Sequence, residues 1–98
     1  MLPSDLRSRI DSGEPIARED HSGADLAGAD LSGGVFDHVR FTGASLVGTD
    51  LREATLLGCD LTRADLGEAD LRHAIVHESD LREARFARAL LSDRKSVV

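Results

Sequence analysis

Histidine and cysteine are the residues of this chain with the clearest capacity for metal binding or nucleophilic chemistry, and it contains four of the first and one of the second. His73 and His77 lie four residues apart, but the five-residue period of the chain, described below, places them on either side of a corner. Neither has a third histidine or a cysteine close to it in the sequence. Since zinc sites use three or four protein ligands, we expect no metal site here.

The remaining candidates for chemistry have simple structural explanations. Cys59 is the single cysteine, so it cannot form an internal disulfide, and we expect a small buried residue. His21 is interpreted as a partly exposed capping residue and His38 as a corner residue. No Ser-His-Asp arrangement, phosphate-binding glycine loop or pair of buried carboxylates can be assigned. The sequence therefore predicts no enzyme, no catalytic residue and no cofactor.

Aspartate recurs with an unusual period. In the stretch "TRADLGEADLRHA", Thr62 to Ala74, the triplet Ala-Asp-Leu returns every five residues. In a helix, leucines five apart would be rotated by about 140° from one another and would not form one stripe. Alternation by two fits better, because it points the small residue and the leucine inward and the aspartate between them outward. The last two residues of each unit then turn a corner.

Fourteen consecutive pentapeptides run from Ala24 to Asp93 without insertion. Each has a large apolar residue, here called its centre, and a small residue two positions earlier. Repeating this unit coils the backbone into a solenoid whose interior is filled by stacked leucine, phenylalanine and alanine. The centres are Leu26, Leu31, Phe36, Phe41, Leu46, Leu51, Leu56, Leu61, Leu66, Leu71, Val76, Leu81, Phe86 and Leu91.

The stretches "ADLAGADLSG", "TRADLGEADL" and "SDLREARF" resemble the pentapeptide-repeat proteins, whose repeat is A(D/N)LXX. The resemblance implies an all-β solenoid, a right-handed quadrilateral β-helix with four pentapeptides per coil and about three and a half to four coils. It also implies a functional alternative, because some members resemble duplex DNA in shape and negative charge and bind type II topoisomerases such as DNA gyrase. The residues that would supply this charge are Asp25, Asp30, Asp50, Asp60, Asp65, Asp70 and Asp80.

Both ends of the repeat region need covers, because a solenoid exposes its core there. We expect an N-terminal cap at residues 1–13, with Ser4 as helix N-cap and with Leu6 and Ile10 over the first coil. The β-helix is expected at residues 14–93, where 14–23 are degenerate and Ile16 and His21 take centre positions. The tail at residues 94–98 is compatible with a second cap, a disordered segment or an end-to-end dimer contact.

Four units per coil predict that residues 20 apart stack on the outer surface. One set, the acidic ladder, consists of Asp30, Asp50 and Asp70 and is followed two residues later by Arg52 and Arg72. This set is compatible with a solvated face. A second set, the apolar column, is the candidate partner-binding surface, although such residues also suit a strand without a partner. The apolar column consists of Val35, Thr55, Leu57 and Ile75.

Charge is uneven along the chain. Residues 1–81 contain sixteen acids and seven bases, a balance of minus nine, and residues 82–98 contain two acids and five bases, a balance of plus three. The acidic bulk argues against direct nucleic-acid binding, and no apolar run reaches the roughly 20 residues that span a bilayer. We expect a cytoplasmic protein.

The sequence predicts a non-enzymatic structural or protein-interaction module whose partner it does not identify. A DNA-mimicking binder of DNA gyrase is the alternative. A homodimer through the C-terminal end or through the apolar column stays open at this point.

Overall fold

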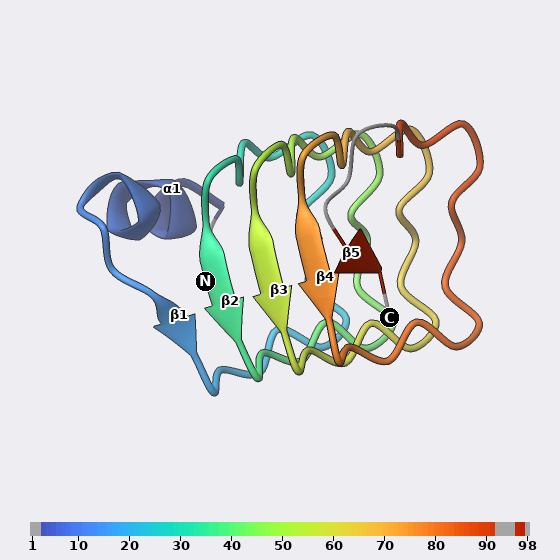
Figure 1. Ribbon diagram of the computed structural model, residues 1–98, viewed down its shortest axis with the longest axis horizontal. Coiled ribbons are helices and arrows are strands. Elements are labelled where there is room, and N and C mark those ends of the chain that lie inside the picture. Colours follow the sequence, from blue (N-terminus) through green and yellow to red (C-terminus); the bar gives the residue numbers. More distant parts are fainter. Residues whose placement is uncertain (1–2, 92–95, 98) are drawn as a thin grey trace.

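Most of the chain winds into a four-sided solenoid that is covered at one end by a helix (Figure 1). The structure is a computed structural model, and it describes residues 3–91 and 96–97. Five short parallel strands lie on one side of the solenoid, called side 1, and form a sheet in the order in which they occur in the chain. They are β1 (Ile16–Ala17), β2 (Val35–Asp37), β3 (Thr55–Leu57), β4 (Ile75–His77) and β5 (Ser96–Val97).

The other three sides are built from isolated β-bridges between residues 20 apart. Four residues stack on each of these sides, so the five strands and the bridges together enclose four coils. Side 2 stacks Asp20, Arg40, Asp60 and Asp80; side 3 stacks Asp25, Ser45, Asp65 and Arg85; side 4 stacks Asp30, Asp50, Asp70 and Leu90.

Hydrogen bonds between adjacent coils satisfy the backbone. The amide of Leu26 donates to the carbonyl of Ser45 at 2.8 Å, and the amide of Ser45 donates back to the carbonyl of Ala24 at 2.9 Å. The same pair of bonds recurs around the solenoid, because each unit meets the unit 20 residues later in one register. Each coil is thus held by its neighbours, and bonds within the coil close its corners, such as the one from the amide of Ala29 to the carbonyl of Leu26 at 3.0 Å.

Every corner is made by a residue with a positive φ. Such residues occur at each fifth position from Gly13 to Arg88, sixteen in all, and only seven of them are glycine. Gly43 has a φ of 65° and Glu53 has a φ of 61°. L residues reach this region at a cost, so the fold requires a costly conformation wherever the sequence does not supply glycine.

The centres and the small residues form one continuous core, as the repeat pattern predicts. The centres from Ile16 to Val76 are all buried, including His21, and the rings of Phe36 and Phe41 meet edge to face with 5.6 Å between their centroids. Leu81, Phe86 and Leu91 are only half-buried, because no described coil covers them. The described residues contain no helix with the length and apolar character that a bilayer span requires.

The predicted N-terminal helix is confirmed as α1 (Pro3–Asp11), which covers the first coil. Leu6 is fully buried and Ile10 packs against the core. The prediction that Ser4 is the N-cap was wrong, because the helix already includes Pro3, a residue whose fixed φ suits the first helical turn. Gly34 makes room for this cap, since a Cβ there would lie 2.9 Å from Cδ1 of Ile10 and 2.7 Å from the ring of Phe36.

His21 was expected to be partly exposed, but it is 8% exposed and stacks on Phe41. Its Nε2 lies 3.0 Å from Oε1 of Glu19, and Glu19 is also paired with Arg9 of α1. The cap helix and the first coil are therefore joined by an ion pair as well as by apolar contacts.

Part of the predicted C-terminal tail continues the sheet. Ser96 pairs with Ile75 and Val97 pairs with Val76 in a parallel arrangement. These paired residues are 21 positions apart in the sequence, whereas the paired residues of the earlier strands are 20 apart. The other positions of the tail, 94, 95 and 98, lie outside the described residues.

Leu66→Ala should lower the free energy of unfolding by about 2 to 5 kcal/mol, because it removes a buried side chain and leaves a cavity between coils. Leu66 is 1% exposed, and Leu51→Ala should behave similarly. Urea unfolding followed by circular dichroism measures the change. Leu90→Ala is the control, since its side chain points outward and the change should stay below about 0.5 kcal/mol. A loss that small for Leu66→Ala would contradict its inward placement.

Glu53→Gly should raise the free energy of unfolding by about 1 kcal/mol. A non-glycine residue costs roughly 1 to 2 kcal/mol in the left-handed region, and the greater freedom of glycine in the unfolded chain cancels part of this gain. Thr55→Gly, two residues away in a strand, should instead destabilise by about 1 kcal/mol. Equal effects of the two substitutions in urea unfolding would show that the corner conformation is not a source of strain.

Candidate functional site

The structure brings the four residues of the apolar column together on the outer face of side 1. Val35 lies opposite Thr55 and Thr55 lies opposite Ile75, while Leu57 follows on the same face of β3. The exposed fraction of Val35 is 41% and that of Ile75 is 36%. Asp37 and His77 flank Leu57 in the register of the sheet. The column is therefore a narrow apolar surface with a polar edge.

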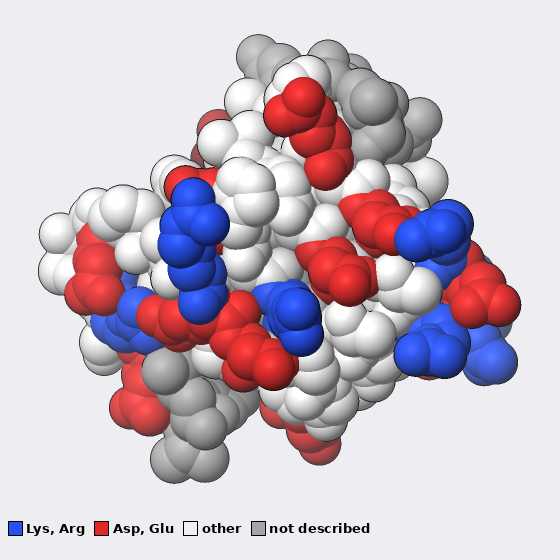
Figure 2. Space-filling model, turned by 90° about the horizontal axis from the view of Figure 1, so that it is seen from below, with Lys and Arg blue, Asp and Glu red and all other residues white. Residues whose placement is uncertain are grey.

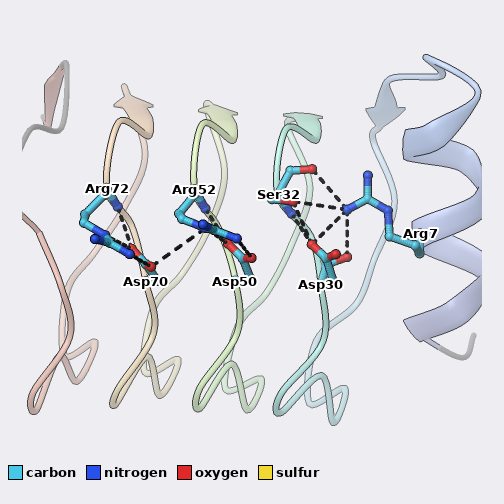
Figure 3. Close-up of polar contacts among 7 residues, drawn as sticks. All are labelled: Arg7, Asp30, Ser32, Asp50, Arg52, Asp70 and Arg72. Atoms are coloured by element: carbon cyan, nitrogen blue, oxygen red, sulfur yellow. Dashed lines mark hydrogen bonds and ion pairs between the residues drawn. The ribbon is translucent and has the colours of Figure 1, made fainter.

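The acidic ladder lies on side 4, and its carboxylates are paired with arginines (Figure 3). Arg52 binds Asp50 through two contacts, Nε to Oδ1 at 2.9 Å and Nη2 to Oδ2 at 2.6 Å. Arg72 binds Asp70 through the same two atoms at the same distances. A longer contact of 3.9 Å between Nε of Arg52 and Oδ2 of Asp70 connects these two ion pairs.

The third carboxylate of the ladder is paired with the cap helix. Nη1 of Arg7 in α1 lies 3.0 Å from Oδ1 of Asp30, and it also donates to the backbone carbonyls of Asp30 and Ser32 at 3.1 Å. The periodicity of the repeat could not reveal this contact, because Arg7 lies outside the repeat. The ladder thus has one arginine for each aspartate.

The ladder carboxylates are held in their charged form. The hydrogen bond from Arg52 is the largest cause that lowers the pKa of Asp50, and the hydrogen bond from Arg72 does the same for the pKa of Asp70. For Asp30, the hydrogen bond from Ser32 is the largest cause of its lowered pKa. Because each charge has a partner of opposite sign, side 4 does not present a strip of net negative charge.

The aspartates also have a structural role that is independent of any ligand. Oδ1 of Asp25 accepts a hydrogen bond from the amide of Ala27 at 3.2 Å, and Oδ1 of Asp65 accepts one from the amide of Gly67 at 3.0 Å. The carboxylate accepts the amide two residues later, as in an Asx turn. This bond supports the corner that follows, so the regular recurrence of aspartate is explained by the fold.

Acids outside the ladder are mixed with bases. On side 2, Arg82 forms a 2.6 Å contact with Asp80 and lowers its pKa to about 2, while Arg40 lies between Asp20 and Asp60 in the stack. Figure 2 views the molecule from below and shows acidic and basic residues interspersed with uncharged ones. In this view, the acidic side chains of the described residues form separate groups rather than one continuous strip.

The residues with potential for metal or nucleophilic chemistry do not converge. His73 is a corner residue with a φ of 63°, whereas His77 ends β4. Across the described residues, no group of three His, Cys, Asp or Glu is placed to hold a metal ion. Cys59 is buried, as the sequence predicts, and donates from Sγ to the carbonyl of Phe36 at 3.3 Å. Burial raises the pKa of its thiol, which disfavours the nucleophilic thiolate.

One feature at the C-terminal end was not predicted from the sequence. An apolar cavity of about 150 Å³ lies at this end, between the side chains of the last two coils. In the last coil, Leu90 is 48% exposed at the position that holds Asp30, Asp50 and Asp70 in the preceding coils. The replacement of aspartate by leucine was visible in the sequence and could have identified this end as unusual.

Comparison with solved structures gives close agreement in fold. A pentapeptide repeat protein from the Arabidopsis thaliana thylakoid lumen is 28% identical, with a TM-score of 0.84, and the match covers 99% of this chain and 64% of that protein. This chain therefore corresponds to less than two thirds of the thylakoid protein. Rfr23, a pentapeptide repeat protein from the cyanobacterium Cyanothece 51142, is 16% identical over 95% of this chain and 98% of its own, with a TM-score of 0.55, and supports the fold alone.

A search of curated proteins found no significant match. The sequence profile of pentapeptide repeats matches residues 22–58 and 59–93 with eight copies, which is most of the chain. Together with the four-sided coil, this match shows that the chain belongs to the pentapeptide-repeat family and folds as a right-handed quadrilateral β-helix.

Proposed function

We propose that this chain is a non-enzymatic protein-interaction module that binds a protein partner through the apolar column. The exposure of Val35 and Ile75 on a regular sheet carries this proposal. Three large hydrophobic residues are exposed among those that the structure describes, and two of them belong to this column. Clustered exposed apolar residues are typical of contact surfaces.

The rigidity of the column favours binding. Val35, Thr55 and Ile75 are β-branched and have few rotamers, and strand pairing holds their backbones about 4.8 Å apart. Little conformational entropy is lost when such side chains are covered. Asp37 and His77 provide polar groups at the edge, so the matching partner surface is a short apolar strip with hydrogen-bonding groups along one border.

The interior of the solenoid supports a binding role rather than catalysis. The cavity at the C-terminal end is lined, among the described residues, by leucine, alanine, valine and phenylalanine. These side chains supply no acid, base or nucleophile. Repeat folds of this kind present extended outer surfaces. In this chain the outward-facing residues differ from coil to coil, whereas the inward-facing ones are mostly apolar.

Ile75→Arg should raise the Kd for the partner by about tenfold or more, because a charge placed within the column must be desolvated on binding. Partners captured with the full chain as bait would be purified, and their Kd measured by calorimetry against the wild type and the variant. Glu53→Arg, which changes charge at an exposed corner, should leave the Kd unchanged. An unchanged Kd for Ile75→Arg, with normal thermal unfolding, would reject this surface.

The paired ladder also favours an interaction module over a DNA mimic. A mimic needs a strip of net negative charge, whereas Asp50 and Asp70 are neutralised by Arg52 and Arg72. We expect a gyrase supercoiling assay to show no inhibition at a large molar excess of the protein. Dose-dependent inhibition that is lost in the Asp50→Asn/Asp70→Asn variant would replace the interaction module with gyrase binding through the ladder.

A further inference from the structure

The apolar cavity inside the C-terminal end of the solenoid has a chemistry that the proposed function does not use. Its volume is about 150 Å³. We propose that this cavity is a binding site for a small, uncharged aromatic hydrocarbon about the size of benzene. This inference does not rest on the proposed partner surface, because the apolar column faces outward from side 1 and the cavity lies within the coil.

Two successive layers of centres enclose the cavity. The inner layer is buried and has one leucine from each side of the third coil, namely Leu56, Leu61, Leu66 and Leu71. The outer layer has one centre from each side of the next coil, namely Val76, Leu81, Phe86 and Leu91. Because all four sides contribute to both layers, the cavity is a space inside the solenoid and not a groove on its surface.

A small centre on side 1 contributes to this space. The centres that stack on this side are Ile16, Phe36 and Leu56 in the first three coils and Val76 in the fourth. Valine has one methylene fewer than leucine, and Ala74, which also lines the cavity, is small as well. The side chains of the fourth coil therefore fill side 1 less completely than those of the coils before it.

The lining determines which chemical class can bind. Among the described residues it consists of leucine, alanine, valine and phenylalanine side chains, which offer neither a hydrogen-bonding group nor a charge. A charged molecule, or one with a hydroxyl group, would lose its hydration there without compensation. An apolar molecule gains by leaving water for an apolar site of this kind. The cavity therefore selects an uncharged hydrocarbon.

The volume determines the size of the ligand. A cavity of about 150 Å³ lined by leucine, isoleucine and phenylalanine is large enough to bind benzene or xenon. Sites for drug-sized molecules are larger, typically about 300 Å³ or more. The cavity therefore suits a single ring, and a larger molecule would have to displace the leucines of the inner layer.

Phe86 favours an aromatic ligand over an aliphatic one. Aromatic rings gain from edge-to-face contact beyond the area that they bury. The same core already uses this contact, since the rings of Phe36 and Phe41 meet with 5.6 Å between their centroids and an angle of 69° between their planes. Phe86 lines the cavity, so its ring is available for an equivalent contact with a bound ligand.

The outer layer provides a way in. Leu81, Phe86 and Leu91 are half-buried, whereas the inner layer is buried. Side chains that are partly exposed change rotamer quickly, so a ligand can enter between them without separation of the coils. The bonds between adjacent coils can therefore stay intact while the ligand binds.

Methyl NMR of the full chain tests the site in the wild type. Benzene, titrated up to saturation in water, should shift the methyl signals of Val76, Leu66 and Leu71 and leave those of Leu26 and Leu31 in the first coil unchanged. Phenol differs from benzene by one hydroxyl group and should bind at least about tenfold more weakly. Absence of shifts with benzene, or an equal Kd for phenol, would overturn the proposal.

Val76→Leu restores the residue that the preceding coil has at this position. It should raise the Kd for benzene by about tenfold or more. It should also raise the temperature of thermal unfolding without ligand, because it fills empty space. Val35→Leu is the matched control, the same change on the outer face of side 1, and should alter neither quantity. Benzene binding that Val76→Leu leaves intact would place the ligand elsewhere and overturn the proposal.

A second copy of the chain is the competing occupant of this space. Sedimentation velocity identifies a protein concentration at which the chain is a monomer, and the benzene titration is carried out there. A chain that is dimeric at every concentration and whose methyl signals do not respond to benzene would assign the cavity to the second copy and would overturn the proposal.

Discussion

A left-handed backbone conformation at every fifth residue is the constraint on which this molecule depends. It turns the chain at each corner, and without it the short sides would not close into a square coil. Nine of the sixteen corner positions carry a side chain in this region, and each costs free energy relative to glycine. Burial of the centres and hydrogen bonds between adjacent coils compensate this cost, and they do so cooperatively because each coil contacts only its neighbours.

The position between the two inward residues decides the character of each side. Where it holds aspartate, the carboxylate accepts an amide of the following corner and can also bind an arginine, as Asp50 does with Arg52. Where it holds Val35, Thr55 or Ile75, the chain forms a three-residue strand and presents an apolar surface. One fold therefore produces a neutralised polar side and an apolar side from the residue type at a single position of the repeat.

Much of the fold follows from the period of the sequence. The inward positions, the four sides and the stacking of residues 20 apart could all be predicted, because a strict repeat transfers one local geometry along the whole chain. The contacts of Arg7 with Asp30 and of Arg9 with Glu19 could not be predicted, since they depend on how α1 sits on the first coil and α1 lies outside the repeat. The 21-residue spacing between the paired residues of β4 and β5 also departs from the 20-residue period on which the other predictions were based.

Helix α1 closes one end of the solenoid and so gives the molecule a direction. A β-helix that is open at both ends could add copies at either end and grow into a fibre, because each added coil would expose a new edge. Here Leu6 and Ile10 occupy the space in which a further coil would stack. Addition of a further coil is therefore blocked at this end, so the nine-residue cap prevents polymerisation through it.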